Sequence, residues 1–264
     1  IIRNIQVYSK NKLNIKFKNE KYKSFLRATK DFDNNTLIQE GGRRVQNLYR
    51  KSSSTKPLIT IVTVVLNKKK DLEKTIKSVL LQRYENIEYI IIDGGSTNST
   101  ISIIKKYNKF IDYWISQKDK GIFDAQNKGI RLSTGNFICT LNAGDYFTEN
   151  SIDYILKKIK KKKNLDIIFG SVMKKKIYSG FNPKKIKTKL NIVPSFVSTF
   201  TNQKLFKIYG LFDTSFKNSS DYEFVYRLLN KKKLNWETTD KNELITVFDL
   251  KGFSSKIKIL DRLI

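Results

Sequence analysis

Hydrophobic residues recur along the middle of the chain as short continuous runs that alternate with helical repeats. The run LITIVTVVL, residues 58–66, is rich in β-branched side chains and typical of a strand buried on both faces of a parallel sheet. Downstream, Leu72, Ile76 and Val79 recur at helical spacing, and EYIII, residues 88–92, is a second short apolar run. The pattern therefore predicts a strand, a helix and a second strand in succession.

The same alternation continues to about residue 169. It predicts, in order, a helix around 101–104, a strand at 112–116, a helix at 121–132, a strand at 136–141, a helix at 152–159 and a strand at 165–169. Strands and helices that alternate in this way indicate an α/β fold with a doubly wound, largely parallel sheet. Ligands of such folds bind beyond the carboxyl ends of the strands.

The first 56 residues have a different pattern. Residues 1–17 alternate weakly between apolar and polar side chains, which is typical of a hairpin, and residues 40–56 are polar, basic and poor in apolar side chains. We therefore expect an N-terminal extension and basic lead-in over 1–56, with few packing contacts in the lead-in. The chain opens on Ile and stops on LDRLI, which indicates a piece cut from a longer protein.

The charge balance is strongly basic. Lysine and arginine number 52 against 24 acidic residues, giving a net charge of +28, which favours phosphate-rich partners or an anionic membrane surface. A well-solvated lysine-rich surface is the alternative explanation. Aromatic residues make up 12% of the chain and leave a nucleic-acid-binding protein as a rival, but they lie within apolar segments and no nucleic-acid motif is present. We expect no nucleic-acid partner.

Histidine is absent and cysteine occurs once, which narrows the possible chemistry. These counts exclude a Ser-His catalytic triad and argue against a zinc site, so acid–base catalysis must depend on carboxylates. Cys139 lies inside the apolar run NFICTL and is expected to be buried, which is compatible with a reducing compartment. No apolar stretch approaches the roughly 20 residues needed to span a bilayer, so we expect a soluble or peripheral protein.

Two candidate carboxylates follow predicted strands. Asp93 comes directly after EYIII and precedes GGSTNST, where either a nucleotide could bind or the carboxylate could accept hydrogen bonds from its own turn. Asp145 stands in LNAGD, four residues after NFICTL, where it could bind a hard cation that bridges two phosphates. A turn built by Asn142, Gly144 and Asp145 is the alternative at that position.

A third carboxylate opens the predicted helix in SSDYEFVYRLL. Ser220 and Glu223 have the S-x-x-E spacing of a capping box. If Glu223 caps the helix, Asp221 is left with a free, ionised carboxylate favoured by the helix dipole, as a general base requires.

Five blocks of the sequence together resemble the family 2 glycosyltransferases of bacterial surface-polysaccharide assembly. These blocks are PLITIVTVVLN, SVLLQRYENIEYIIIDGGSTNST, DYWISQKDKGIFDAQNKGI, TGNFICTLNAGDYF and GLFDTSFKNSSDYEFVYRLL. The resemblance covers residues 57–255, including a GFSS segment near its end, and leaves 256–264 as the start of a C-terminal segment. Residues 1–39 lie outside it.

The resemblance implies a GT-A fold, which is Rossmann-like, and transfer of a sugar from a UDP-linked donor with inversion. It also implies a divalent cation, Mn²⁺ or Mg²⁺, and a saccharide or lipid-linked acceptor in capsule or lipooligosaccharide synthesis. From the basic excess we expect the protein to act in the cytoplasm, peripherally at the inner leaflet of the membrane. Such a reaction is a single displacement and needs no covalent intermediate.

The motif positions assign roles to individual residues. The resemblance implies that the nucleoside is held by Thr63, Val65, Asn67 and Asp93. Asp119 would lie beside the donor, Asn142 would start the DxD-like segment, Asp145 would bind the metal and Asp221 would be the catalytic base.

The sequence departs from the family pattern at two places. The family often has two acidic residues where this chain has NAGD, and many relatives carry a His-Gln pair where this chain has Phe196 and Val197. A catalytically silent binding domain of the same fold is therefore the alternative to an active transferase.

Overall fold

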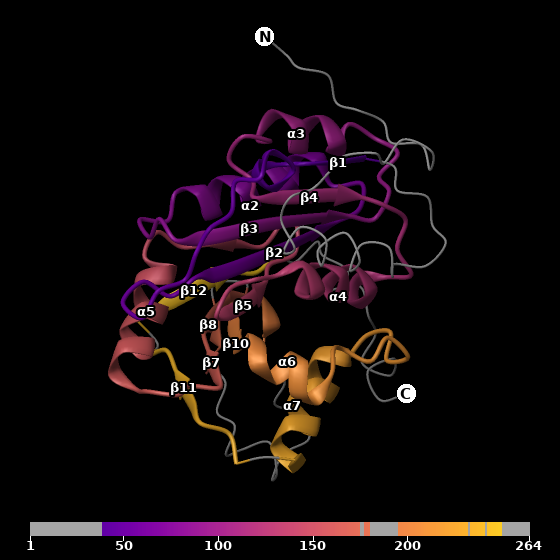
Figure 1. Cartoon of the computed structure of the whole chain (residues 1–264). Helices are drawn as coiled ribbons and strands as arrows, with labels where there is room; N and C mark the ends of the chain where they lie inside the picture. The colour runs from indigo at the N-terminus through magenta and orange to yellow at the C-terminus, as the bar shows by residue number, and fades with distance from the viewer. Residues whose placement is uncertain (1–38, 175–176, 180–194, 232, 241, 250–264) are drawn as a thin grey trace.

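The computed structural model describes residues 39–174, 177–179, 195–231, 233–240 and 242–249. The expected hairpin at 1–17, the GFSS segment and residues 256–264 lie outside this part of the chain. The described residues form two sheets (Figure 1). The larger has the strand order β1-β4-β3-β2-β5-β10-β7-β11, and the smaller has the order β6-β12-β8-β9.

Four parallel strands form the centre of the larger sheet, as the sequence predicts. They are β2 (Ile59–Val65), β3 (Ile87–Asp93), β4 (Tyr113–Ser116) and β5 (Phe137–Thr140). The predicted helices are also present: α2 (Lys69–Leu80), α3 (Thr100–Lys106), α4 (Ile122–Leu132) and α5 (Ser151–Lys161). Every residue of β2 and β3 is buried, which explains their continuous apolar runs.

The remaining strands form both antiparallel and parallel pairs. In the larger sheet β10 (Thr199–Asn202) runs antiparallel between β5 and β7 (Ile167–Phe169), and β11 (Trp236–Thr238) lies at the edge. The smaller sheet contains β6 (Tyr146–Phe147), β8 (Ser171–Lys174), β9 (Ile177–Ser179) and β12 (Leu244–Val247). Short 3-10 helices, η1 (Arg43–Gln46) and η3 (Phe196–Ser198), precede β2 and β10.

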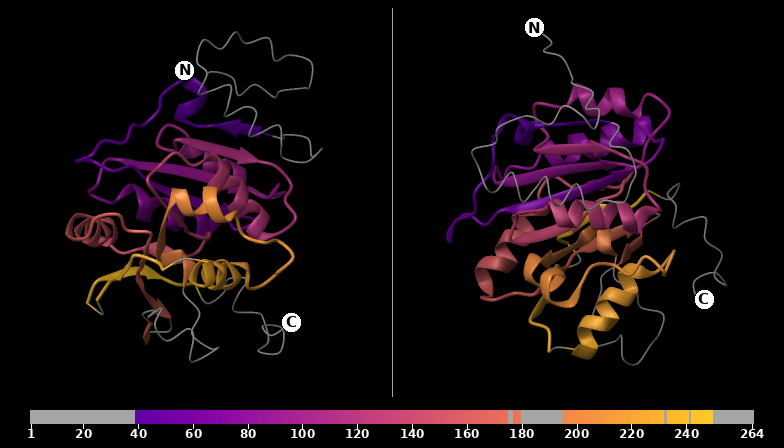
Figure 2. Two further views of the ribbon diagram at one scale, coloured as in Figure 1. Left: turned by 60° about the horizontal axis from the view of Figure 1, so that its bottom comes forward. Right: turned by 45° about the vertical axis from the view of Figure 1, so that its right-hand side comes forward.

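The large sheet has a hydrophobic core on each face. One core packs side chains of α4 against the sheet together with those of α6 (Gln203–Tyr209) and α7 (Ser220–Lys231). The other packs α2, α3 and α5 against the opposite face (Figure 2). The alternation of helices between the faces is that of a doubly wound fold. Among the described residues, no helix is long and apolar enough to cross a membrane.

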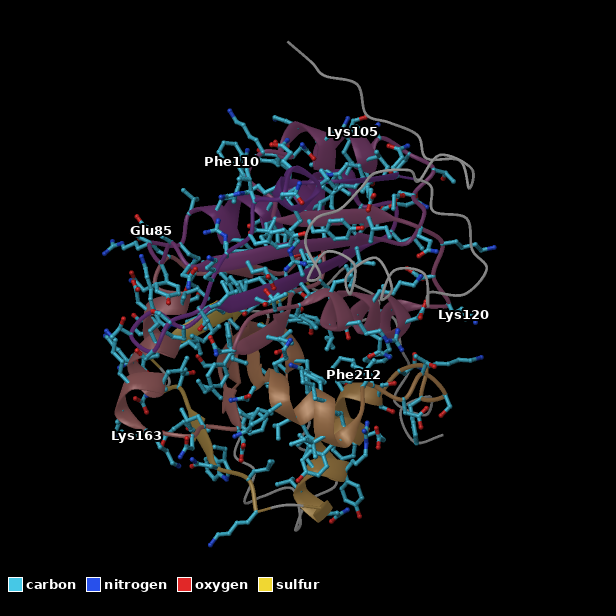
Figure 3. The ribbon with its side chains drawn as sticks, in the orientation of Figure 1. Glu85, Lys105, Phe110, Lys120, Lys163 and Phe212 are labelled. Atoms are coloured by element: carbon cyan, nitrogen blue, oxygen red, sulfur yellow. The ribbon has the colours of Figure 1, made fainter. Side chains whose placement is uncertain are left out.

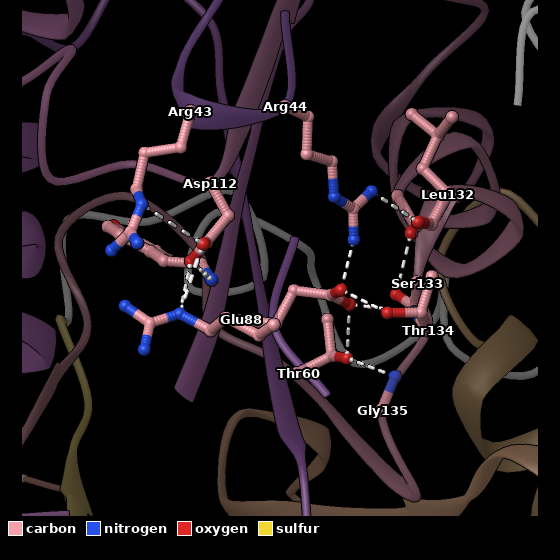
Figure 4. Close-up of polar contacts among 12 residues, drawn as sticks. Arg43, Arg44, Thr60, Glu88, Asp112, Leu132, Ser133, Thr134 and Gly135 are labelled. Atoms are coloured by element: carbon pink, nitrogen blue, oxygen red, sulfur yellow. Dashed lines mark hydrogen bonds and ion pairs between the residues drawn. The ribbon is translucent and has the colours of Figure 1, made fainter. Parts of the chain in front are cut away.

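The first part of the basic lead-in packs against the sheet, so the expectation of few contacts is wrong there, whereas residues 51–56 are exposed as expected. Its first residues form β1 (Gln39–Gly41), which pairs with β4. Arg44 is 1% exposed, forms an ion pair with Glu88 and donates a hydrogen bond of 2.7 Å to the carbonyl of Leu132 (Figure 4). Glu88 also accepts a hydrogen bond of 2.7 Å from Thr60. Composition hides this packing because a buried arginine and an exposed one contribute equally to the count of charges.

Candidate active site

A cavity of about 480 Å³ opens at the carboxyl ends of the parallel strands. Loops that follow β2, β4 and β5 form one side of it, and the segments after β12 and before α7 complete it. Its polar lining includes Lys68, Asp119, Lys120, Asp124, Asn142, Asp145, Thr214, Lys217 and Asp249. In Figure 3, Lys120, one of the lining residues, lies just before α4, while the labelled Phe212 belongs to the hydrophobic core beneath the segment that leads to α7. The cavity thus lies where ligands of doubly wound sheets bind.

Asp93 ends β3 but does not line the cavity. Its buried carboxylate accepts hydrogen bonds from the Gly95 and Ser96 amides at 3.1 and 2.8 Å, and from the Ser116 hydroxyl at 2.7 Å. For this motif the sequence left open either nucleotide binding or a carboxylate bonded to its own turn, and these contacts are those of the turn. Asp93 therefore fixes the loop after β3.

The three residues expected near the end of β2 lie in different environments. Thr63 is buried within the sheet and hydrogen-bonds the Tyr89 hydroxyl at 3.1 Å, away from the cavity. Val65 lines the cavity. Asn67 adopts a left-handed conformation with φ of 54° and joins two loops, because its side chain accepts a hydrogen bond of 3.0 Å from the Thr97 amide. Only Val65 of the three contacts the cavity.

Asp119 does line the cavity, in the turn between β4 and α4. Its carboxylate accepts a hydrogen bond of 2.9 Å from the Gly121 amide, and burial raises its pKa. A β-carbon at Gly94 would overlap this carboxylate, so glycine is required at that position for Asp119 to approach the loop after β3. The DGG turn therefore makes room for a cavity carboxylate.

The NAGD turn brings Asn142 and Asp145 to the same wall of the cavity. The Asp145 amide donates to the Asn142 carbonyl at 3.0 Å, and Thr75 of α2 donates its hydroxyl to the Asp145 carbonyl at 2.7 Å. Asp145 is only 3% exposed, and this burial raises the pKa of its carboxyl to about 7. A buried carboxylate of this kind gains from a positive partner.

Asp249 is a cavity residue that our sequence analysis did not identify. Its amide donates a hydrogen bond of 2.7 Å to the Asp145 carboxylate, and its own negative charge raises the pKa of Asp145 further. The Lys68 ammonium lies 3.6 Å from the Asp249 carboxylate. The sequence could have indicated Asp249, because it directly follows the apolar run ITVF just as Asp93 directly follows EYIII.

Asp145 and Asp249 supply the oxygen donors that a hard divalent cation prefers. The described residues contain no cluster of three or more acidic, histidine or cysteine side chains that could hold a metal ion. Mg²⁺, however, is usually bound by one or two carboxylates together with substrate phosphates, so a pair of carboxylates beside an open cavity suits it. The site therefore fits a cation that binds together with a diphosphate.

Asp221 lies in the first turn of α7 and is half-buried. Burial raises the pKa of its carboxyl to about 6, although the carboxylate accepts a hydrogen bond of 2.9 Å from the Tyr222 amide. The charge of Lys174, on β8, lowers the pKa of both Asp221 and Asp145. Its ammonium lies 4.5 Å from the centre of the Phe248 ring, which lines the cavity. Lys174 is thus within electrostatic reach of both carboxylates.

The predicted capping box at the start of α7 is not formed. The Ser220 hydroxyl donates to the carbonyl of Phe216 at 2.7 Å, and Glu223 forms an ion pair of 2.8 Å with Arg227 instead of turning back to the helix start. Ser220 and Glu223 do have the spacing of a capping box. Arg227, however, lies one helical turn after Glu223 and binds its carboxylate instead.

Phe196 and Val197 are both buried, Phe196 in the core that includes α7 and Val197 in the core on the opposite face of the sheet. The Phe196 ring lies 5.3 Å from that of Phe212 and 6.2 Å from that of Phe224, with edge-to-face geometry in both pairs. Of the two residues that replace the His-Gln pair, Phe196 therefore packs among aromatic side chains.

Comparison with known sequences identifies the relatives of this chain. A family model described as Glycosyl transferase family 2 matches residues 60–247. An uncharacterised glycosyltransferase of Mycobacterium tuberculosis is 28% identical over 180 residues, which are 65% of this chain and 68% of that protein. Chondroitin synthase of Escherichia coli is 28% identical over 144 residues, which are 51% of this chain and 21% of that enzyme.

Solved structures with the same fold bind nucleotides. A fragment of Staphylococcus aureus TarS superposes with a TM-score of 0.59 at 14% identity, covering 72% of this chain and 60% of the fragment. A mannosyltransferase from Pyrobaculum calidifontis, in complex with GDP-Man and Mn²⁺, gives a TM-score of 0.56 at 13% identity, covering 86% of this chain and 64% of that protein. The chain thus spans less than two thirds of either structure, and the likeness establishes the GT-A fold.

Proposed function

This chain belongs to the family 2 glycosyltransferases, and from that premise we propose that it is an inverting enzyme with a nucleotide-sugar donor. The donor is UDP-linked in this proposal, and the acceptor is a hydroxyl of a saccharide or lipid-linked glycan. The observation that carries the proposal is the joint presence of Asp119, Asn142 and Asp145 in one cavity at the carboxyl edge of the sheet. Related GT-A structures support a donor of this class, because TarS was crystallised with UDP-GlcNAc and the mannosyltransferase with GDP-Man and Mn²⁺.

In the proposed mechanism Asp145 and Asp249 hold a divalent cation, Mn²⁺ or Mg²⁺. When bound, the cation neutralises charge that develops on the departing nucleoside diphosphate. Thr75 fixes the turn that carries Asp145, because its hydroxyl donates to the Asp145 carbonyl and accepts from the Gly144 amide at 2.9 Å. Val65, Asp119 and Asn142 line the space for the donor, while Asn67 and Asp93 fix the neighbouring loops and Thr63 stays within the sheet.

Asp221 is the general base of the proposed reaction. It removes the proton from the acceptor hydroxyl as that oxygen attacks the anomeric carbon and the bond to the diphosphate breaks. A base is most effective when its pKa lies near the working pH, and a pKa of about 6 leaves Asp221 mainly ionised at pH 7. The single displacement inverts the anomeric centre and needs no protein nucleophile.

The basic surface suits an enzyme that works on glycans of the bacterial cell surface. We propose that a net charge of +28 holds the protein at the anionic inner leaflet, in the cytoplasm, where lipid-linked capsule or lipooligosaccharide acceptors are presented. This part of the proposal concerns location and acceptor, and it is independent of the donor chemistry.

The experiment that tests the proposal is a panel of nucleotide sugars with Mn²⁺ or Mg²⁺, recording thermal shift and released nucleoside diphosphate. We expect one donor to stabilise the protein in a metal-dependent way and to be turned over. Asp145→Asn should lose the metal-dependent stabilisation, and Asp221→Asn should bind the donor but release nucleoside diphosphate about 10²- to 10⁴-fold more slowly. Asp153→Asn, on α5 and outside the cavity, is the matched control. Failure of every donor to bind the wild-type protein would favour the silent binding domain.

A further inference from the structure

A buried glutamine makes contact with the first residue of the NAGD turn. Gln126 lies on α4 and is 4% exposed. Its side-chain amide nitrogen donates a hydrogen bond of 3.0 Å to the side-chain oxygen of Asn142. Asn142 in turn lines the cavity, three residues before Asp145. The family often has an acidic residue at the Asn142 position, so the orientation of this amide decides what the turn offers a ligand.

The hydrogen bond fixes which end of the Asn142 amide is available. Because the Oδ1 atom of Asn142 accepts from Gln126, the Nδ2 group is the end left for a ligand in the cavity. Within the part of the chain that the structure describes, no hydrogen bond from Nδ2 to another residue is present. The cavity wall therefore presents a donor at the position where the family often presents an acceptor.

The reverse orientation of the two amides is less favourable. As observed, the Oε1 atom of Gln126 is buried without a hydrogen-bond partner among the described residues. If Asn142 donated to Gln126 instead, the buried group without a partner would be the Gln126 NH₂. Proteins leave a buried carbonyl under-satisfied more readily than a buried N–H group. Gln126 thus favours the arrangement in which Asn142 directs its NH₂ toward the cavity.

We propose that Gln126 is a positioning residue that holds the Asn142 amide as a hydrogen-bond donor to the diphosphate of the nucleotide sugar. The inference rests on the donor class proposed above and adds a division of labour within the NAGD turn. Asn142 binds a phosphate oxygen directly, while cation binding falls to Asp145 and Asp249. A carboxylate at position 142 would repel a diphosphate in the absence of metal, whereas a neutral donor attracts it.

Nucleoside diphosphate binding with and without metal tests this division. Isothermal titration calorimetry with UDP and with GDP, in EDTA and then in MnCl₂, gives the affinities, and EPR of Mn²⁺ gives the metal affinity alone. We expect the wild-type protein to retain measurable affinity in EDTA. Asn142→Asp should weaken metal-free binding about tenfold or more, as expected for loss of a hydrogen bond to a charged group, and should tighten Mn²⁺ binding.

The role of Gln126 is isolated by Gln126→Met, which keeps the volume of the side chain and removes both polar atoms. We expect about a three- to tenfold loss of metal-free affinity, because the Asn142 amide can then rotate. If Gln126 acts only through Asn142, the double variant Gln126→Met/Asn142→Asp should bind no more weakly than Asn142→Asp alone. Ile130→Val, in the core side of the same helix, is the control for loss of stability without loss of affinity.

Two results would overturn the inference while leaving the proposed function intact. One is a wild-type protein that binds UDP or GDP only when Mn²⁺ is present. The other is a Gln126→Met variant with wild-type affinity in EDTA. Absence of any nucleotide binding in both buffers would instead overturn the proposed function and this inference together.

Discussion

The carboxyl of Asp221 illustrates how one residue is tuned by its position. It opens α7, where the helix dipole and the Tyr222 amide favour the ionised form, yet burial outweighs them and raises its pKa to about 6. The Asp221 carboxyl therefore binds a proton more readily in the native chain than in the unfolded chain, and this difference makes the free energy of unfolding depend on pH. Stability is therefore lost as the pH rises from the unfolded pKa of 3.8 to the native value of about 6, it levels off above 6, and the cost is absent below the unfolded value.

The same shift predicts the pH dependence of turnover. Because a general base must be ionised, kcat should rise as the pH increases through about 6 and level off above it. Asp221→Asn should lower kcat about 10²- to 10⁴-fold, with little change in the Kd of the donor. Initial rates between pH 5 and 8 measure the first effect and calorimetry the second. A wild-type profile that is flat over this range would assign the base elsewhere.

Asp249 gives a second prediction at the scale of single residues. The Asp249 carboxylate lies beside Asp145. Asp249→Asn removes one negative charge from the proposed cation site and should therefore weaken Mn²⁺ binding. EPR titration of Mn²⁺ measures this effect without requiring turnover. Asp71→Asn, which removes a different carboxylate close to Lys68, is the matched control. Equal Mn²⁺ affinity in Asp249→Asn and wild type would leave Asp145 as the single carboxylate ligand.

Among the elements, the lead-in before β2 makes an unexpected contribution to stability. Arg44 of η1 reaches Glu88 of β3 beneath the surface, while its neighbour Arg43 stays half-exposed, 4.0 Å from Asp112 (Figure 4). The two arginines are adjacent in sequence but have opposite environments. Loss of Arg44 would leave Glu88 without its cationic partner, whereas loss of the half-exposed Arg43 would leave Asp112 paired with Arg50 at 3.0 Å.

This contrast gives a prediction with an internal control. Arg44→Met should lower the free energy of unfolding by about 3–5 kcal/mol, because Glu88 would be left as a buried and uncompensated charge. Arg43→Met should cost about 1 kcal/mol or less, because Arg43 is half-exposed and the Asp112 carboxylate keeps its pair with Arg50. Urea denaturation measures both. Adding Glu88→Gln to Arg44→Met should recover part of the loss, and no recovery would show that the packing of Arg44 matters more than its charge.

The sequence predicts most of the elements on which the fold depends, for a clear physical reason. The parallel strands and their helices are buried on predictable faces, so their apolar runs and repeats are regular. Strand β10, with the sequence TFTN, was not anticipated, because its threonines are buried as hydrogen-bonded or enclosed groups and interrupt any apolar run. Strand β1 was also missed, because its sequence QEG contains no hydrophobic residue and so gives no apolar pattern.

The candidate site was predicted in part. Asp119, Asn142 and Asp145 do share one cavity, but Thr63 does not reach it. A strand buried on both faces contains no polar alternation, so its sequence does not reveal which side a given residue faces. The approach of Asp249 to Asp145 joins segments 104 residues apart, and only the folded sheet brings them together.

For the molecule as a whole, the excess of lysine predicts binding to anionic membranes. Vesicles containing phosphatidylglycerol should retain more protein in a flotation assay than phosphatidylcholine vesicles do, at low salt. Added NaCl should release the protein, because screening shortens the range of the attraction. Equal retention by the two kinds of vesicle would remove the membrane part of the proposal and leave the transferase assignment unaffected.

Cys139 is the single cysteine of the sequence, and it lies 1% exposed in β5 with a pKa raised well above that of an ordinary thiol by burial. A thiol in this state reacts slowly with maleimides. Any cysteine introduced on the surface would therefore be labelled selectively in the otherwise native protein. Pairs of fluorophores or spin labels placed across the cavity could then report, in solution, how far its walls move when a nucleotide binds.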